Sequence, residues 1–240
     1  MAGADSPRRV VVKLSGNTLA GTAGDVFGED ALDFIAAELD AARQAGVQLA
    51  VVVGGGNVIR GARFCPTGPG RISADYAGML ATVVNAIVLR ERLERSGAPA
   101  VHYGAFPVPR MMPAFEPTAC IADLEAGRIA VLAGGTGNPL LTTDTAAALR
   151  AVEVGADLVL KATRVDGVYS ADPETDSNAE LFDRISYREV LERGLAVMDL
   201  TAVSFCMEHD VPVRVFNYAV PGNIRRAAAG EPVGTLIEGT

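Results

Sequence analysis

The chain has 240 residues, of which 49% are hydrophobic and 5% aromatic, and its formal net charge is −8. This size suits one continuous α/β domain over residues 1–240, and we expect residues 1–8 to be a flexible N-terminal segment. The negative charge disfavours nonspecific binding to nucleic acid or to an anionic membrane. No run approaches the roughly 18 apolar residues of a membrane helix, and no apolar signal segment follows the N-terminus, so a cytoplasmic location is expected.

Short apolar runs alternate with helix-like stretches along the chain, and the runs are typical of strands buried on both faces. In chain order we expect strand 10–12, helix 29–44, strand 49–53, helix 75–95, strand 129–132, helix 142–153, strand 158–160, helix 201–208 and strand 213–216. Segment 107–117, rich in proline and methionine, is expected to be a loop or an arm. This alternation predicts a mainly parallel sheet covered by helices.

Cysteine and histidine form neither a disulfide pattern nor a metal pattern. Cys65, Cys120 and Cys206 are odd in number, far apart and without C-x-x-C spacing, so we expect buried or incidental thiols. His102 and His209 are isolated, which leaves a zinc site without a ligand cluster.

Three of the predicted strands run into glycine-rich segments. Strand 10–12 leads into KLSG at 13–16, strand 49–53 into GGGN at 54–57, and strand 129–132 into AGGTGNP at 133–139. Open α/β sheets bind ligands beyond the carboxyl ends of their strands, and glycines let the backbone approach a phosphate closely. Arg60 adds a planar donor fork after the second loop. These loops predict a phosphate site, although one glycine triplet alone would fit a simple tight turn.

Both lysines of the chain directly follow apolar strands, Lys13 after 10–12 and Lys161 after 158–160. A lysine at the carboxyl end of a strand can place positive charge beside phosphate oxygens, including those of a transferring phosphoryl group. The alternative is that each lysine reaches the sheet edge and pairs with a carboxylate.

The third glycine-rich loop carries short polar side chains, which are Thr136, Asn138, Thr142, Thr143 and Asp144. They can hold an acceptor phosphate or base, whereas Thr143 or Asp144 as a simple helix cap is the alternative. Asp144 need not be a strong base, because phosphoryl transfer depends mainly on positioning and charge compensation. The sequence lacks a Walker A motif and a G-x-G-x-x-G fingerprint, which argues against a P-loop enzyme and an NAD-dependent reductase.

An ordered set of motifs resembles the bacterial uridylate kinases of the amino-acid kinase superfamily. The motifs are VKLSG at 12–16, GGGN at 54–57 with RG at 60–61, DYAGMLAT at 75–82, GTGNP at 135–139 with TTD at 142–144, KATRVDGVY at 161–169 with ADP at 171–173, VMDLTA at 197–202, and GE at 230–231 with GTL at 234–236. The resemblance covers nearly the whole chain. It implies a three-layer αβα sandwich with an open, mainly parallel sheet, and an ATP-dependent phosphotransferase that converts UMP to UDP.

The same resemblance implies roles for individual residues. The catalytic residues would be Lys13, Asp144 and Lys161. ATP would be surrounded by Lys13, Leu14, Ser15, Gly16, Gly56, Arg60, Thr163, Tyr169 and Asp172. The acceptor nucleotide would be held by Gly55, Asp75, Thr136, Gly137, Asn138, Pro139, Leu140, Leu141, Thr142 and Thr143. Mg²⁺ would arrive on the ATP phosphates without a certain protein ligand, and the chain would assemble as a homohexamer.

Asp75 is chemically suited to a ribose, because a carboxylate accepts two hydrogen bonds from a diol. The alternative is that Asp75 caps a helix that begins near Tyr76.

Two departures from the family affect what the resemblance implies. Asn17 stands where the family usually has glutamate, and segment 110–122, RMMPAFEPTACIA, lacks the acidic-Pro-Tyr stretch and the basic residues that follow it. Regulation by GTP or UTP is therefore not carried over. Three functions stay open: a UMP kinase, a paralogous kinase for a modified pyrimidine nucleotide or another small phosphate or phosphonate, and a nucleotide-binding protein without turnover.

Overall fold

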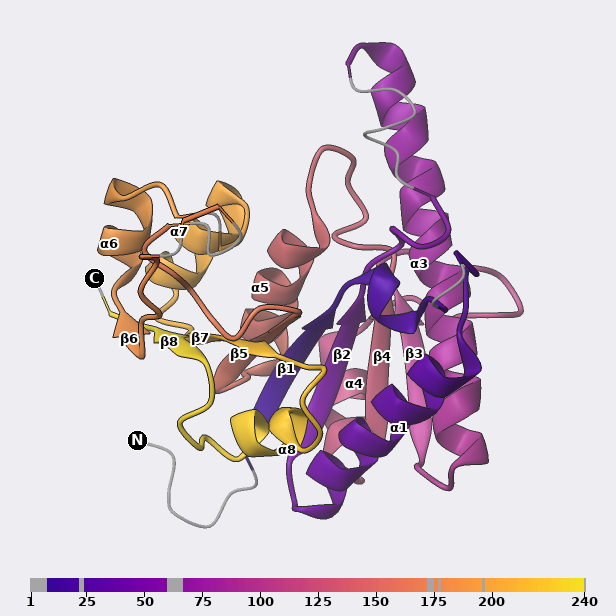
Figure 1. Ribbon diagram of the computed structural model, residues 1–240. Coiled ribbons are helices and arrows are strands. Elements are labelled where there is room, and N and C mark those ends of the chain that lie inside the picture. The colour runs from indigo at the N-terminus through magenta and orange to yellow at the C-terminus, as the bar shows by residue number, and fades with distance from the viewer. Residues whose placement is uncertain are drawn as a thin grey trace.

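The computed structural model describes residues 8–21, 24–59, 67–171, 175–176, 178–195 and 197–239. In these residues, helices lie on both faces of one sheet (Figure 1). The strands are β1 (Arg9–Leu14), β2 (Gln48–Val53), β3 (Ala100–Gly104), β4 (Ile129–Ala133), β5 (Leu158–Thr163), β6 (Arg184–Ile185), β7 (Val213–Asn217) and β8 (Thr235–Ile237). The helices are η1 (Gly16–Leu19), α1 (Glu29–Gln44), α3 (Pro69–Arg95), α4 (Pro117–Glu125), α5 (Thr143–Val154), α6 (Tyr187–Glu192), α7 (Leu200–Glu208) and α8 (Asn223–Ala228).

The strands follow the order β3-β4-β2-β1-β5-β7-β8-β6. Neighbouring strands run parallel except β7 and β8, which pair antiparallel. The strands of the first half of the chain lie on one side of β1, and β5 begins the other side. The winding direction therefore reverses between β1 and β5, and the carboxyl ends of strands at such a point form the usual ligand crevice of an open α/β sheet.

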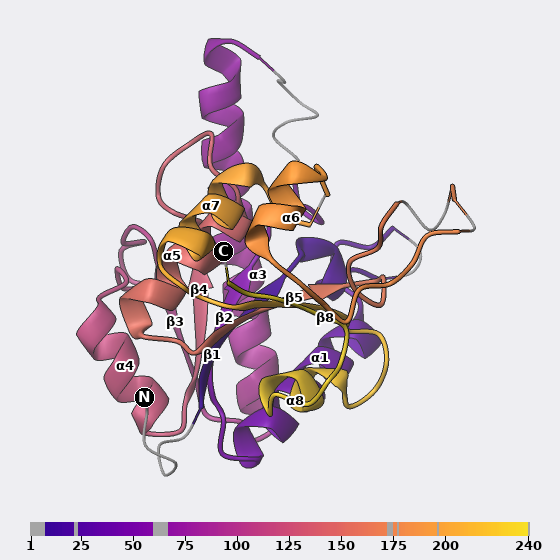
Figure 2. The same ribbon diagram turned by 90° about the vertical axis from the view of Figure 1, so that its left-hand side faces the viewer.

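Alternation along the central strand divides the core into two layers. In β1, Val10 and Val12 face one hydrophobic cluster and Val11 faces the other, and all three are fully buried. Helices α1, α3 and α8 cover the first face, and α4, α5, α6 and α7 cover the second, as Figure 2 shows. The predicted three-layer αβα sandwich with a mainly parallel sheet is confirmed.

The segment predicted as a loop or arm is only partly irregular. Val108 forms an isolated bridge with Met112, and Gly104 forms one with Ala114. Helix α4 then begins at Pro117, because Glu116 accepts hydrogen bonds from the first free N–H groups of the helix and proline suits the first helical position. The divergent segment 110–122 is therefore a turn followed by the start of a helix.

Helix α3 differs from the sequence expectation in its start and in its apolar character. It begins at Pro69 rather than at residue 75, because proline suits the first turn of a helix and follows Gly68, whose φ of 73° favours glycine. By length and composition its segment Gly70–Arg95 could cross a membrane, with a mean hydropathy of 1.6 over 18 residues. A core helix passes the same test, and the inner side of α3 packs on β3 and β4.

The cysteine prediction is confirmed for the described thiols. Cys120 and Cys206 are buried and free, and burial raises the pKa of each thiol to about 12. Such thiols are protonated at neutral pH and therefore unreactive. Cys65 lies outside the described residues.

Candidate active site

The two lysines are neighbours in the sheet. Lys13 on β1 and Lys161 on β5 are direct partners in the parallel register. Their side chains project toward the face covered by α5, because Val11 and Val159, two residues earlier on each strand, belong to the cluster on that face. Two positive charges thus lie side by side at the reversal point of the sheet.

Asp144, in the first turn of α5, lies between these lysines. Lys13 Nζ is 2.9 Å from Asp144 Oδ1, and Lys161 Nζ donates to Asp144 Oδ2 at 2.7 Å. The three side chains are only 12–14% exposed. Lys161 Nζ also donates to the carbonyl oxygen of Val197, which ties the centre to the segment before α7. Each lysine does pair with a carboxylate, but at the centre of the sheet rather than at its edge.

The electrostatic balance of this cluster favours anions. Burial acts to raise the pKa of Asp144, but the charges of Lys13 and Lys161 outweigh it and hold the pKa of this carboxyl below its ordinary value. Burial lowers the pKa of Lys161, although Asp144 acts in the opposite direction. Two ammonium groups around one carboxylate carry a net positive charge, which suits phosphate oxygens in a site with little water.

The first two glycine-rich loops touch each other beside this charged centre. A Cβ atom on Gly16 would lie 2.3 Å from Asn57 Oδ1 and 2.7 Å from the nitrogen of Gly56. The N–H of Gly54 donates to the carbonyl oxygen of Leu14 at 2.8 Å. No side chain fits at position 16, so glycine is required for this approach of the two loops. Ser15 and Gly16, predicted to contact ATP, lie on this loop. Leu14, predicted likewise, is the last residue of β1, and its side chain is buried in the core.

A buried amide on α3 supports the second loop. Asn85 is fully buried, and its Nδ2 donates to the carbonyl oxygen of Gly54 at 2.6 Å and to Asn57 Oδ1 at 2.7 Å. Gly55 backs onto the same helix, since a Cβ there would lie 2.7 Å from the carbonyl oxygen of Gly78. Asn85 was not identified from the sequence. The only feature that could have indicated its role is that it is a polar residue on an apolar helix face.

A cavity of about 290 Å³ lies between α3, the second loop and the third loop. Seven of the predicted acceptor residues line it, which are Gly55, Asp75, Thr136, Asn138, Leu141, Thr142 and Thr143, and Gly56 and Arg71 line it as well. Gly137, Pro139 and Leu140 belong to the same loop but do not line the cavity. The N–H of Gly134 donates to Thr82 Oγ1 at 2.7 Å, which fixes the start of the third loop on α3.

Asp75 is not a helix cap, so that alternative is wrong. Helix α3 has already begun at Pro69 with Gly68 as its cap residue. The carboxylate of Asp75 instead accepts hydrogen bonds from Arg71 Nε at 2.7 Å and from the N–H of Leu140 at 2.9 Å. It therefore joins α3 to the third loop at the cavity wall.

The cap of α5 is Thr142 rather than Thr143 or Asp144. Thr142 Oγ1 accepts from the N–H of Asp144 at 3.0 Å, which leaves the Asp144 carboxylate free for the lysines. Thr142 Oγ1 also donates to Asp199 Oδ2 at 2.5 Å, and Thr145 Oγ1 donates to the same carboxylate at 3.1 Å. Asp199 is itself the cap of α7. The sequence could have indicated this cap, but not the contact of Asp199 with the start of α5.

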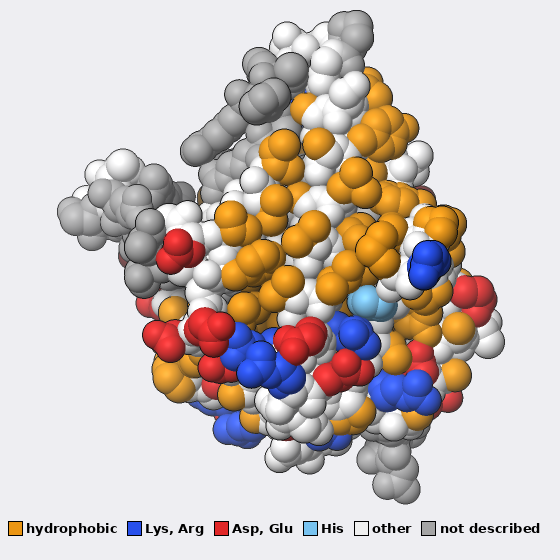
Figure 3. Space-filling model, turned by 90° about the vertical axis from the view of Figure 1, so that its right-hand side faces the viewer, with side chains coloured by type: hydrophobic (Ala, Val, Ile, Leu, Met, Phe, Trp, Pro, Cys, Tyr) orange, Lys and Arg blue, Asp and Glu red, His pale blue; other side chains and the backbone are white. Residues whose placement is uncertain are grey.

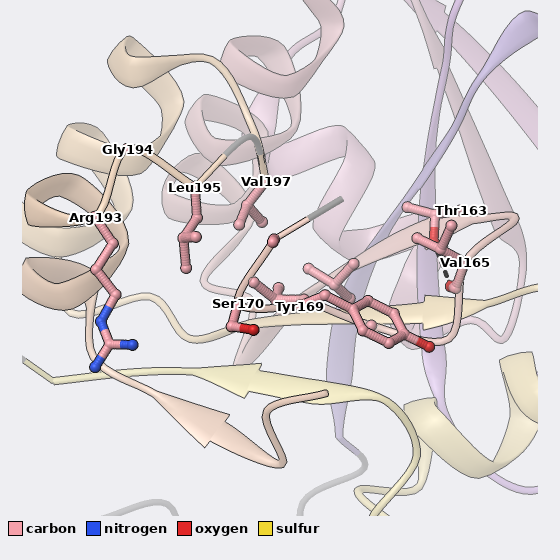
Figure 4. A pocket seen from close by; sticks show the side chains of 12 residues that line it. Thr163, Val165, Tyr169, Ser170, Arg193, Gly194, Leu195 and Val197 are labelled. Carbon is pink, nitrogen blue, oxygen red and sulfur yellow. Dashed lines mark hydrogen bonds between the residues drawn. The ribbon is translucent and has the colours of Figure 1, made fainter. Parts of the chain in front are cut away.

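A second cavity of about 510 Å³ is lined by the segment that follows β5 and by the segment that follows α6. Figure 4 shows Tyr169 and Thr163 on one side and Arg193, Leu195 and Val197, from the segment after α6, on the other. Val197 binds Lys161 through its carbonyl oxygen, so this cavity adjoins the charged centre. Arg60 and Asp172, predicted to contact ATP, lie outside the described residues.

Comparisons with known proteins agree with this geometry. The model of the amino acid kinase family matches residues 8–217. The chain is 46% identical to a uridylate kinase of Ectopseudomonas mendocina (strain ymp) over 96% of this chain and 94% of that protein. It is 49% identical to a uridylate kinase of Bradyrhizobium sp. (strain ORS 278) over 97% of this chain and 98% of that protein.

A solved structure shows the same fold over nearly its whole length. The crystal structure of UMP kinase from Bacillus anthracis matches with a TM-score of 0.93 and 33% identity, covering 97% of this chain and 96% of that chain. The family model, the relatives and the solved structure agree with a site built at the strand ends of a mainly parallel sheet. The chain belongs to the amino acid kinase family.

Proposed function

We propose that this protein is an ATP-dependent kinase that transfers the γ-phosphoryl group of ATP to UMP, giving UDP and ADP. The observation that carries the proposal is the Lys13–Asp144–Lys161 cluster, which lies beside both the 510 Å³ cavity and the 290 Å³ cavity. A positive centre between a donor cavity and an acceptor cavity is what in-line phosphoryl transfer needs. The relatives named uridylate kinases favour UMP as the acceptor.

In this reaction a phosphate oxygen of UMP bonds to the γ-phosphorus while the bond from that phosphorus to the β–γ bridging oxygen breaks. Negative charge moves from the transferring group onto the departing ADP. Lys13, at the end of β1, would offset charge on the transferring group, and Lys161, held by Asp144 and Val197, would face the donor. Asp144 would orient both ammonium groups rather than remove a proton.

The two cavities differ in the chemistry of their walls. The larger cavity has mainly apolar side chains, including Val165, Leu195 and Val197, and would take the adenine ring of ATP. The smaller cavity presents the hydroxyls of Thr136, Thr142 and Thr143 and would take the nucleoside monophosphate. Of the assigned donor residues, Thr163 and Tyr169 line the larger cavity, whereas Gly56 lines the smaller one. The individual roles are predictions.

Mg²⁺ would be carried mainly by the ATP phosphates. The described residues contain no group of three metal-ligating side chains, and the Asp144 carboxylate already contacts two lysines. Mg²⁺ commonly binds phosphate oxygens and water with few protein ligands. The ion would neutralise phosphate charge during transfer.

The outer side of α3 supports the predicted assembly into a homo-oligomer, with a hexamer expected from the family resemblance. Tyr76, Leu80 and Val84 recur every four residues and are 49%, 53% and 43% exposed. Figure 3 shows hydrophobic side chains spread over this face of the molecule. Apolar patches of this kind mark interaction surfaces.

Leu80→Glu is therefore expected to shift the protein to a smaller assembly without unfolding it. A buried charge in an apolar interface is costly, whereas a solvated glutamate on a free helix is not. Gel filtration with light scattering measures the mass. Val152→Glu, which changes an exposed apolar residue on α5, is the matched control and should leave the mass unchanged. Equal masses for wild type and Leu80→Glu would reject this face as the interface.

An acceptor panel tests the function itself. Purified protein is incubated with Mg-ATP and each of UMP, CMP, dUMP and dTMP, and the diphosphates are measured. UMP is expected to give the highest kcat/KM. Faster turnover of another phosphate or phosphonate would instead favour a paralogous kinase, and tight ATP binding without transfer to any acceptor would favour a nucleotide-binding protein without turnover.

A further inference from the structure

An ion pair on α3 lies in the wall of the acceptor cavity. Arg71 Nε is 2.7 Å from Asp75 Oδ1, with the two residues one helical turn apart. Both side chains line the cavity, and they are 29% and 14% exposed. The pair thus combines a partly exposed cation with a carboxylate that is mostly withdrawn from water.

This pair is poorly placed to stabilise the helix. Arg71 lies in the first turn of α3, where the helix dipole disfavours a cation. An arginine that precedes its acidic partner by four residues is also the less favourable orientation for a helical ion pair. The helix itself therefore gives no reason for this arrangement.

The second oxygen of Asp75 is also held. Asp75 Oδ2 accepts from the N–H of Leu140 at 2.9 Å, and Leu140 has the left-handed φ of 70° that is unusual for a leucine. The carboxylate is thus fixed from α3 on one oxygen and from the third loop on the other. Each oxygen keeps a second lone pair, so both can still accept from a ligand.

We infer that Arg71 is a positioning residue that sets the preference of the acceptor site for ribose over deoxyribose. The inference rests on the proposed function, in which Asp75 accepts hydrogen bonds from the 2′- and 3′-hydroxyl groups. Two such bonds need a carboxylate with one fixed orientation, and Arg71 supplies that orientation through Oδ1. Arg71 acts through Asp75 and not on the reacting phosphates.

The test is a double-mutant cycle with Arg71→Met, Asp75→Asn and the double variant, assayed with UMP and dUMP. Arg71→Met is expected to raise KM for UMP about tenfold, as loss of a charge-assisted contact would, with kcat changed less than about twofold. The ratio of kcat/KM for UMP to that for dUMP should fall. The double variant should resemble Asp75→Asn alone, because the two residues act as one unit.

Arg90→Met is the matched control. Arg90 and Glu94 form another pair with the same spacing on α3, 3.0 Å apart and outside the acceptor cavity. This variant should keep the wild-type ratio. Arg71→Gln, which retains polarity without the cation, should reproduce the effect of Arg71→Met and guards against a folding defect in either variant.

Two results would overturn the inference. One is an unchanged UMP-to-dUMP ratio in folded Arg71→Met and Arg71→Gln proteins, and the other is additive effects in the cycle. Both results are measured in variants that still convert UMP to UDP, so neither would contradict the proposed function. If the wild-type protein makes no UDP, the proposed function is wrong, and the role inferred for Arg71 is wrong with it.

Discussion

Replacing Lys13 by methionine is expected to lower kcat about 10²- to 10³-fold, the usual cost of removing one charge-stabilising donor at a transition state. KM for ATP and UMP should change much less, because the charge counts most when phosphoryl charge is shifting between donor and acceptor. Steady-state kinetics at saturating Mg-ATP and UMP provides the measurement.

The fold should survive this change. Lys13 lies at the carboxyl end of β1, and Asp144 keeps its hydrogen bond with Lys161 when Lys13 is removed. Thermal unfolding should therefore show a folded, cooperative protein. Arg128→Met is the control, because it removes a cation from just before β4, at the opposite end of the sheet. A kcat within about twofold of wild type for Lys13→Met would reject its assigned role.

Asp144→Asn is expected to damage both stability and turnover. It leaves two ammonium groups on neighbouring strands facing a neutral amide, and breaking a buried ion pair costs about 3–5 kcal/mol. Chemical denaturation at neutral pH measures this loss. Turnover should fall at least about 10²-fold, because the two lysines lose their common anchor.

The pH dependence of the stability difference gives a second check on Asp144. The folded-state pKa of this carboxyl is lowered, so its stabilising contribution is complete above the unfolded pKa and is lost as pH falls through the folded pKa. The difference in unfolding free energy between wild type and Asp144→Asn should thus be largest at neutral pH. It should shrink in acid, below the ordinary carboxyl value of 3.8.

Glu91→Gln is the control for this experiment. Glu91 pairs with Arg95 on α3, and the two side chains are 52% and 65% exposed, so loss of this carboxylate should cost less than about 1 kcal/mol. The Asp144 variant should also lower the pKa of Lys161 further, since Asp144 is the stronger of the two carboxylates, Asp144 and Asp199, that act to raise it. A stable Asp144→Asn protein with an unchanged pH profile would contradict the role of Asp144 as the anchor of both lysines.

Several parts of the fold and of the site were not predicted correctly, because they depend on contacts with residues distant in the chain. The short strands β3, β6 and β8 were missed, because AVHYG, RI and TLI lack a long apolar run and are specified by their neighbours in the sheet. The start of α3 was misplaced, because the Gly68–Pro69 signal precedes the apolar part of the helix. Asn85 and Asp199 were missed because each acts on a loop or helix distant in sequence. Arg71 was missed because its pair with Asp75 is an ordinary helical spacing, and only the contact of Leu140 with Asp75 ties that pair to the third loop.

The glycine-rich loops and the two lysines at strand ends were determined by the sequence itself, because doubly buried strands and the glycines after them leave a strong local pattern. The sequence also determined that residues 134–144 form a polar loop before a helix, because this pattern too is local in the chain. Only the tertiary structure decided that Lys13 and Lys161 are neighbours in the sheet register and that Asp144 lies between them. The physical reason is the strand order, since reversal of the winding places β5 directly beside β1 and directs both lysines toward the start of α5.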